Sequence, residues 1–255
     1  MDPLLQTNNV SISFGGIKAV QDFNISLYEG EIVGLIGPNG AGKTTAFNLL
    51  TGVYTPTTGT IEFDGVDLTG MKPYKITQHG IARTFQNIRL FGNLTVLDNV
   101  KIACNYLVRY NLAEAILRIG RYGKEEERIE EEAMELLRIF KLDDKKDERA
   151  ANLPYGLQRH LEIARALAAK PKLLLLDEPA AGMNPQETKD LMELIDGIRK
   201  RFNLTILLIE HDMSLVMGIC ERLYVLEFGK ILAQGIPQEI KSNADVIRAY
   251  LGEEV

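Results

Sequence analysis

Glycines, a lysine and two threonines are spaced between positions 37 and 45 so that they could bind the phosphates of a nucleotide. A triphosphate requires several donors that converge on its oxygens, and glycines allow the backbone to turn with its N–H groups pointing inward. The order, Gly followed after four residues by Gly-Lys-Thr, is that of a phosphate-binding loop. We expect Lys43 to pair with the β- and γ-phosphates of ATP and the Thr44 hydroxyl to bind Mg²⁺. The residues of this candidate site are Gly37, Pro38, Asn39, Gly40, Ala41, Gly42, Lys43, Thr44 and Thr45.

Two carboxylates, Asp177 and Glu178, follow the apolar run Leu173–Leu176 and form a second candidate group. The carboxyl ends of parallel strands face the ligand crevice, so these acids are expected where the phosphate loop holds the triphosphate. Asp177 could then hold Mg²⁺, directly or through water, and Glu178 could accept a proton from the water that attacks the γ-phosphorus. Standing alone, such a pair could equally be solvated acids in a loop, and the phosphate loop in the same chain favours the catalytic interpretation.

Uninterrupted apolar runs predict the buried strands that position these groups. Residues 32–36 lead into the phosphate loop, residues 173–176 lead to Asp177, and residues 204–209 form a third run. Such runs are typical of parallel strands that are covered on both faces. Between the last two runs, Asn184-Pro185-Gln186-Glu187 predicts a helix start with a capping box. The pattern indicates an α/β fold with a mainly parallel sheet.

The N-terminal third of the chain predicts an additional antiparallel sheet. Apolar and polar residues alternate over residues 10–14 and 23–27, which predicts half-buried strands. Asp64-Gly65 after Thr60–Phe63 has the chemistry of a hairpin turn. Residues 81–85 predict a further short strand that ends at Gln86.

From residue 94 the apolar period becomes that of helices. We expect helices over 94–110 and 113–117, and a third that begins with the charged residues 124–128, whose acids form a solvated face. A helix over about 157–169 then returns to the core. We therefore expect one domain over residues 1–255, with an α/β core (1–92 and 157–255) and an inserted helical subdomain (93–156).

The composition excludes several classes of function. The 255 residues carry a net charge of −6, which argues against a nucleic-acid partner held by a basic surface. Cys104 and Cys220 are isolated, so neither a disulfide framework nor a cysteine-based zinc site is expected. No secretory leader or apolar run long enough to span a bilayer occurs, so we expect a soluble, cytoplasmic protein whose membrane role would require a partner.

Taken together, these motifs make the chain resemble the ATP-binding-cassette (ABC) ATPases over essentially its whole length. The resemblance implies a P-loop NTPase (RecA-like) core and the cofactors ATP and Mg²⁺. Gln86 matches the family's glutamine loop, which senses the γ-phosphate and metal, and His211 matches the switch histidine. Phe14 lies where the family keeps an aromatic residue that stacks on adenine, although its alternation with Val10 and Ile12 also permits a core position.

The family's signature, Leu-Ser-Gly-Gly-Gln, is altered in this chain. Pro154 replaces the serine that binds the opposite subunit's γ-phosphate, and Tyr155 replaces the first glycine. Gly156 and the start of the following helix remain as donors to an anion from the second subunit. The matching residues are Leu153, Pro154, Tyr155, Gly156, Leu157 and Gln158.

Four segments together resemble the ATPase subunits of branched-chain amino-acid importers. They are Leu153–Gly156, Arg83–Asn87, Asp177–Pro185 and Glu210–Met213, and residues 105–125 resemble the extra segment of the longer of that system's two ATPases. The resemblance implies a peripheral subunit at the cytoplasmic face of the membrane, bound to permease subunits and to a second ATPase subunit, and served indirectly by an extracytoplasmic solute-binding protein. Alternatives are an importer of urea or other amides and a soluble cassette ATPase. A nucleotide kinase is less consistent with the paired acids and His211.

Overall fold

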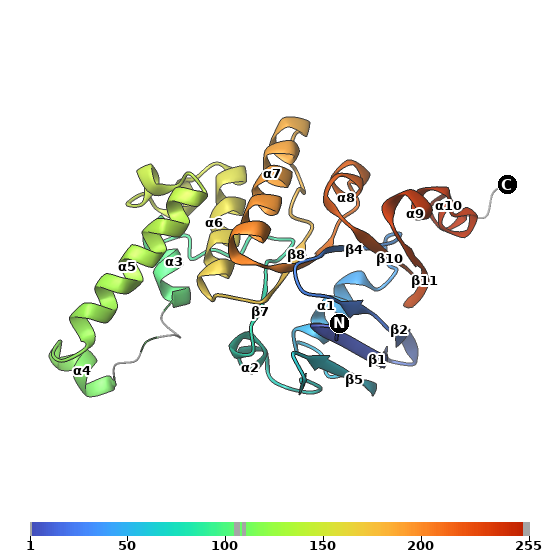
Figure 1. The fold of residues 1–255 in the computed structure, drawn as a ribbon, viewed down its shortest axis with the longest axis horizontal. Coiled ribbons are helices and arrows are strands. Elements are labelled where there is room, and N and C mark those ends of the chain that lie inside the picture. Colours follow the sequence, from blue (N-terminus) through green and yellow to red (C-terminus); the bar gives the residue numbers. More distant parts are fainter. Residues whose placement is uncertain (1, 105–107, 109–110, 252–255) are drawn as a thin grey trace. The chain divides into compact units, whose positions relative to one another are not determined.

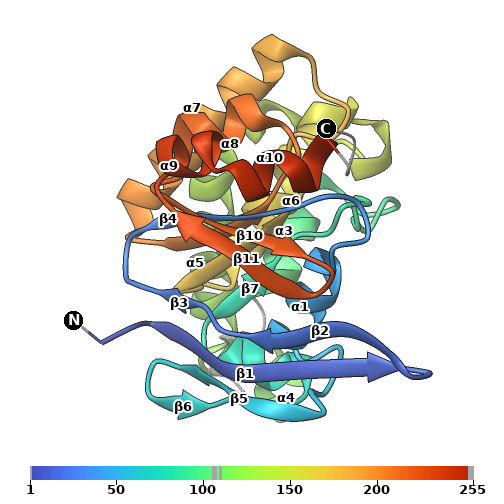
Figure 2. The same cartoon turned by 90° about the vertical axis from the view of Figure 1, so that its right-hand side faces the viewer.

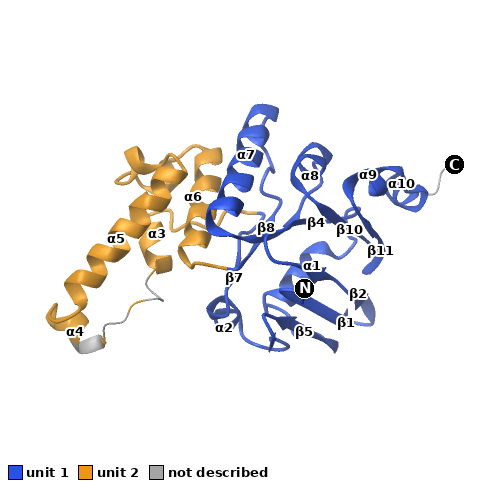
Figure 3. Cartoon of the chain, in the orientation of Figure 1, with its two compact units in different colours: residues 1–86, 172–255 blue, residues 87–171 orange. Residues whose placement is uncertain are grey.

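The computed structural model describes residues 2–104, 108 and 111–251, and the chain divides into two compact units (Figure 3). The first unit comprises residues 1–86 and 172–255, and the second comprises residues 87–171. The helical unit is therefore wider than the expected 93–156, because it includes α6 (Tyr155–Ala168), which packs against α3 (Val96–Cys104) and α5 (Tyr122–Ile139).

The first unit is built on a six-stranded sheet in the order β11-β10-β4-β9-β8-β7. All neighbours are parallel except the β10/β11 pair, which is antiparallel. Every residue of β4, β8 and β9 is buried, as the apolar runs predicted. The strands are β4 (Ile32–Ile36), β7 (Ile81–Arg83), β8 (Leu173–Asp177), β9 (Thr205–Ile209), β10 (Arg222–Glu227) and β11 (Lys230–Gly235).

A second, antiparallel sheet contains the N-terminal strands in the order β2-β1-β5-β6, with β3 paired to β1. Residues 23–27 do not form the single strand that was expected, because β2 ends at Phe23 and β3 begins only at Ser26. Just before this break Asp22 has a positive φ of 46°, and the Asn24 side-chain amide donates to the Asp22 carbonyl at 2.7 Å. The strands are β1 (Leu5–Phe14), β2 (Ile17–Phe23), β3 (Ser26–Leu27), β5 (Thr58–Phe63) and β6 (Val66–Asp67).

Helices cover both faces of the six-stranded sheet (Figures 1 and 2). Helix α1 lies between this sheet and the N-terminal sheet, whereas α7, α8, α9 and α10 lie on the opposite face. Phe47, Leu49 and Leu50 of α1 belong to the apolar core that joins the two sheets. The helices are α1 (Lys43–Leu50), α2 (Pro73–Gln78), α7 (Pro185–Phe202), α8 (Met213–Ile219), α9 (Pro237–Ser242) and α10 (Ala244–Leu251).

The predicted start of α7 is confirmed. The Asn184 side chain accepts hydrogen bonds from the Gln186 and Glu187 amides, both at 3.0 Å, and the Glu187 carboxylate accepts one from the Asn184 amide at 2.9 Å. Pro185 occupies the first helical position, where an N–H would make no intrahelical hydrogen bond, so the absence of an N–H costs nothing.

The second unit is helical, with α3, α5 and α6 packed on one another. Helix α3 runs only from Val96 to Cys104, so it starts two residues later than expected, and part of the expected span to residue 110 lies outside the described residues. The remaining elements are α4 (Leu112–Leu117) and the short helices η2 (Asp143–Lys145) and η3 (Ala150–Asn152).

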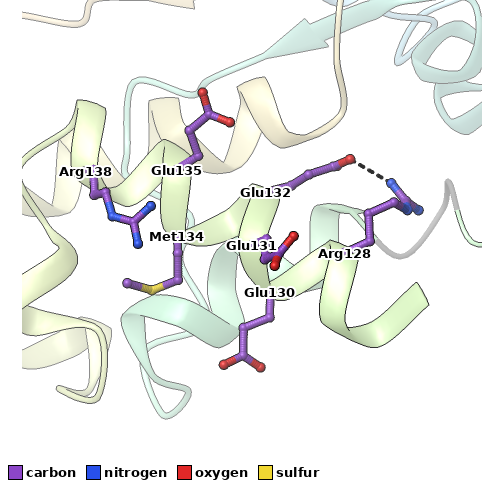
Figure 4. A pocket seen from close by; sticks show the side chains of 7 residues that line it. All are labelled: Arg128, Glu130, Glu131, Glu132, Met134, Glu135 and Arg138. Carbon is purple, nitrogen blue, oxygen red and sulfur yellow. Dashed lines mark hydrogen bonds and ion pairs between the residues drawn. The ribbon is translucent and has the colours of Figure 1, made fainter. Parts of the chain in front are cut away.

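Helix α5 presents its charged residues on an outer face, as predicted. Arg128 forms ion pairs with Glu125 and Glu132, each at 2.8 Å, while Ile129, Ala133 and Leu137 of the opposite face are buried. Figure 4 shows a surface hollow along this helix, which is lined by Arg128, Glu130, Glu131, Glu132, Met134, Glu135 and Arg138. No helix in the described ranges is long and apolar enough to cross a membrane.

Candidate functional site

The loop between β4 and α1 has the geometry that its glycines predict. Gly37 and Gly42 adopt positive φ values of 149° and 103°, and Gly42 is the N-cap of α1. A Cβ atom at Gly37 would lie 2.0 Å from the carbonyl oxygen of Leu226, and one at Gly42 would lie 2.6 Å from that of Ala19. Only glycine therefore fits these two positions. The loop leaves the start of α1, with its unpaired N–H groups, able to meet an anion.

Lys43 lies within this loop and contacts its backbone. Its Nζ atom donates to the carbonyl oxygens of Gly37 at 2.7 Å and Pro38 at 2.9 Å. Burial lowers the pKa of Lys43, and the negative charges of Glu178 and Asp177 oppose that shift. The cation and the two acids predicted from distant segments are therefore neighbours in one unit.

Asp177 and Glu178 stand at the carboxyl end of β8, as expected. Asp177 is buried, and its Oδ2 atom pairs with Nη2 of Arg83 at 2.7 Å. Glu178 follows the strand with a φ of 47°, a left-handed conformation that is uncommon for a residue with a side chain. Its amide donates to the carbonyl of Ile209 on β9 at 2.9 Å, so the sheet fixes the backbone that carries this carboxylate.

Gln86 and His211 approach the Glu178 carboxylate from two other loops. The Gln86 amide donates to Glu178 Oε2 at 2.7 Å, and His211 Nδ1 lies 3.8 Å from the same oxygen. The His211 side chain is 62% exposed, whereas that of Glu178 is 18% exposed. The structure thus brings together the three residues predicted to act in catalysis.

Glu210 organises the loops around this group, and its role was not predicted from the sequence. Its carboxylate accepts from the Ala180 amide at 2.8 Å and from the His211 and Asp212 amides at 3.1 and 3.3 Å. Burial raises the pKa of Glu210, and these backbone donors oppose that shift. The only signal in the sequence was an acid directly after a buried strand. Glu210 ties the loop after Glu178 to the loop that carries His211.

Phe14 ends β1 and is not a core residue. Its side chain is 44% exposed and meets the edge of Tyr54, with ring centroids 5.1 Å apart. Val10 and Ile12, which alternate with it, are buried. The exposed ring is consistent with the adenine-stacking alternative.

The altered signature begins helix α6 in the helical unit. The helix starts at Tyr155, two residues earlier than expected, with Pro154 as an N-cap that makes no side-chain hydrogen bond. Gln158 donates to the Leu153 carbonyl at 2.8 Å, and the Tyr155 side chain is 47% exposed. Gly156 and Leu157 thus lie in a first helical turn whose N–H groups have no capping side chain.

The oxygen ligands predicted for Mg²⁺ suit that ion. The described residues contain no group of three or more His, Cys, Asp or Glu that could hold a metal by itself. The Asp177 carboxylate, the Thr44 hydroxyl and the Gln86 amide offer oxygen atoms of the kind that Mg²⁺ takes together with nucleotide phosphates.

The fold and the site define a phosphate-loop ATPase of the cassette class. The family model described as ABC transporter matches residues 20–181, and a model described as branched-chain amino acid ATP-binding cassette transporter matches residues 230–255. The high-affinity branched-chain amino acid transport ATP-binding protein LivG of Escherichia coli (strain K12) is 49% identical over 98% of each chain. The chain belongs to the ABC transporter family.

Solved structures support the same assignment. MJ1267, an ATP-binding cassette of an ABC transporter solved in its ADP conformation, is 32% identical with a TM-score of 0.85, and the match covers 99% of this chain and 100% of that one. The cassette MJ0796, solved as a dimer in a post-hydrolysis state with ADP and phosphate, is 25% identical with a TM-score of 0.76 over 91% and 98% of the two chains. The predicted P-loop fold with a mainly parallel sheet is confirmed.

Proposed function

We propose that this chain hydrolyses ATP to power the uptake of branched-chain amino acids through a membrane permease. One observation supports the hydrolytic part: the Glu178 carboxylate at the end of β8 accepts from Gln86 at 2.7 Å, with His211 at 3.8 Å and the phosphate loop in the same unit. A carboxylate held in this way can accept a proton from an attacking water. The kinase alternative would instead need an acceptor pocket and has no use for this constellation.

Each residue of the site has a definite task in this proposal. The backbone N–H groups of residues 37–44 and the Lys43 ammonium bind the phosphates, and Phe14 stacks on the adenine. Thr44, Asp177 and Gln86 hold Mg²⁺, which neutralises charge on the β- and γ-phosphates when it is bound. Glu178 takes the proton of the nucleophilic water. His211 contacts the γ-phosphate, at a position set by the Glu210 carboxylate that binds its amide.

The second half of each ATP site comes from another ATPase subunit, of the same or a paralogous chain. In this proposal the N-terminus of α6, with Gly156 and its neighbours, meets the γ-phosphate bound by the partner. MJ0796, which resembles this chain, forms a dimer after hydrolysis. Pro154 supplies no hydroxyl to that contact, so we expect the ATP-bound dimer to be weaker than in relatives with the serine.

The choice of solute follows from the relatives rather than from the site, because the transported molecule need not touch this chain. The match of residues 230–255 to a model for branched-chain amino acid cassettes favours these solutes over urea or other amides. We place the chain at the cytoplasmic face of the membrane on its permease, with solute delivered by an extracytoplasmic binding protein.

Reconstituted transport tests this proposal. The chain, its permease subunits and the solute-binding protein are placed in proteoliposomes, and uptake of labelled leucine and of urea is measured with and without internal ATP. We expect ATP-dependent leucine uptake that is lost when Glu178→Gln replaces the natural chain. Uptake of urea alone would overturn the solute, and ATP hydrolysis that never associates with a permease would favour a soluble cassette ATPase.

A further inference from the structure

Arg83 is a buried cation that lies directly against the proposed metal ligand. It ends β7, three residues before Gln86, and its Nη2 atom pairs with Asp177 Oδ2 at 2.7 Å. The two side chains are only 7% and 4% exposed. Charges so far from water interact strongly with each other and are costly to leave unpaired.

The guanidinium is also held from its other sides. Nη1 donates to the Asn48 side chain on α1 at 2.7 Å and lies 3.4 Å from the Thr51 hydroxyl. The guanidinium carbon lies 5.4 Å from the centre of the Phe47 ring and 5.0 Å from that of Phe85. A planar cation between two rings, with a fork of donors, has little freedom to leave its partner. Arg83 therefore fixes Asp177 relative to the helix that follows the phosphate loop.

Lys43 does not provide this countercharge. Its ammonium donates to the carbonyls of Gly37 and Pro38, and its effect on the acids acts through space. Among the described residues, Arg83 is the cation in direct contact with Asp177. The guanidinium pairs with Oδ2 of Asp177, so that Oδ1 can bind a metal.

We propose that Arg83 is a positioning residue that serves as the resident countercharge of Asp177. It holds the carboxylate in place and keeps the affinity of the nucleotide-free site for Mg²⁺ low, so that the ion enters together with nucleotide phosphates. The inference rests on the proposed function, in which Asp177 is a metal ligand. It goes further by assigning a role to an arginine outside the nucleotide motifs.

Thermal unfolding of the nucleotide-free protein in EDTA and in Mg²⁺ tests this role. Arg83→Met keeps a flexible apolar side chain between the rings and removes the charge. In EDTA the melting temperature should fall by about 10 °C, as expected when one partner of a buried pair is lost. Mg²⁺ should restore about 5 °C, the shift produced by a ligand at roughly a hundred times its Kd. The natural protein should show no such response to Mg²⁺.

Arg222 provides a matched control at the opposite end of the sheet. It pairs with Glu31 at 2.7 Å and lies 5.4 and 5.3 Å from the rings of Tyr28 and Tyr224. Arg222→Met should lower the melting temperature equally with and without Mg²⁺. Arg83→Lys, which keeps a charge, should respond to Mg²⁺ as the natural protein does.

The result that would overturn the inference is a Mg²⁺ shift for Arg83→Met no larger than that for Arg222→Met. If Arg83→Met does not fold, Asn48→Leu, which removes one hydrogen-bond partner of the guanidinium, replaces it. We expect Mg²⁺ to raise the melting temperature of Asn48→Leu, by less than the rise expected for Arg83→Met. If Mg²⁺ does not raise it at all, the inference is contradicted equally. Asp177→Asn in the Arg83→Met background should abolish the Mg²⁺ response, and a response that persists would also contradict it.

A separate measurement distinguishes failure of the proposed function. Asp177→Asn alone should weaken ADP binding in Mg²⁺ but not in EDTA. If it does so while Arg83→Met shows no Mg²⁺ response, only the role of Arg83 is refuted. If Asp177→Asn leaves Mg²⁺-dependent ADP binding intact, Asp177 is not the metal ligand. The proposed function is then wrong on this residue, and so is the proposed role of Arg83.

Discussion

Replacing Glu178 with Gln is the most direct test of the hydrolytic mechanism. Glutamine keeps the shape of the side chain and its contact with Gln86 but cannot accept a proton. A positioned base typically supplies about 10² to 10⁴ in rate. We expect a loss in the upper part of this range, because the neighbouring acid among the described residues, Asp177, is paired with Arg83, and the His211 side chain is 62% exposed. A loss of about 10³ to 10⁴ corresponds to ~4–5.5 kcal/mol in the activation free energy.

Phosphate release under saturating ATP measures this loss, and calorimetry of ATP binding shows whether the site remains intact. We expect turnover to fall by that factor while ATP still binds. ATP that is not hydrolysed should hold two subunits together, so the sedimentation coefficient should increase with ATP. Glu193→Gln, the same change on an exposed turn of α7, is the matched control and should leave turnover unchanged.

Turnover of Glu178→Gln at the natural rate would refute the assignment of the base. Failure of the dimer alone would instead show that this chain does not pair with itself. Pro154→Ser in the same chain separates these cases further, since it restores a hydroxyl at the N-cap of α6. We expect the double variant to sediment as a dimer at lower ATP concentrations than Glu178→Gln alone.

Three further predictions follow from the site and the core. Lys43→Ala should weaken ATP binding by roughly 10- to 150-fold, the equivalent of one charge-assisted contact of about 1.5–3 kcal/mol, and unchanged affinity by calorimetry would contradict the phosphate role. Gln86→Ala removes the 2.7 Å contact with Glu178 and should lower permease-stimulated hydrolysis while nucleotide affinity changes little; unaltered stimulation would show that coupling does not pass through this residue. Burial raises the pKa of the Cys104 thiol to about 11 and that of Cys220 to about 12. Because a raised pKa keeps the thiol protonated, neither should react with a disulfide reagent at pH 8 until the protein is denatured, and native reactivity should rise with pH; rapid native reaction would contradict their burial.

Much of the fold could be predicted because its signals are local. The four leucines before Asp177 fill one strand, and the capping box at Asn184 fixes the start of α7 within four residues of chain. The phosphate loop could be predicted equally well, because its conformation leaves room only for glycine at Gly37 and Gly42. Each of these features depends on residues adjacent in sequence.

Contacts between distant segments could not be predicted in this way. Arg83 and Asp177 are 94 residues apart, and nothing near Arg83 indicates that its partner is an acid at the end of another strand. The strand that was expected to reach Phe85 ends at Arg83, and Gln86, three residues further on, bonds to Glu178 after β8. Helix α6 begins at Tyr155 rather than Leu157 because no side chain at its N-terminus marks the start.

The left-handed backbone of Glu178 sets stability against activity at this position. A left-handed conformation costs a residue with a side chain about 1–2 kcal/mol, and glycine would adopt the same φ of 47° without that cost. Glu178→Gly should therefore relieve strain while it removes the base, and its melting temperature should not fall. Selection for heat resistance alone would favour the inactive residue here. In the proposed mechanism, a glutamate is kept at this position for turnover and at a cost in backbone strain.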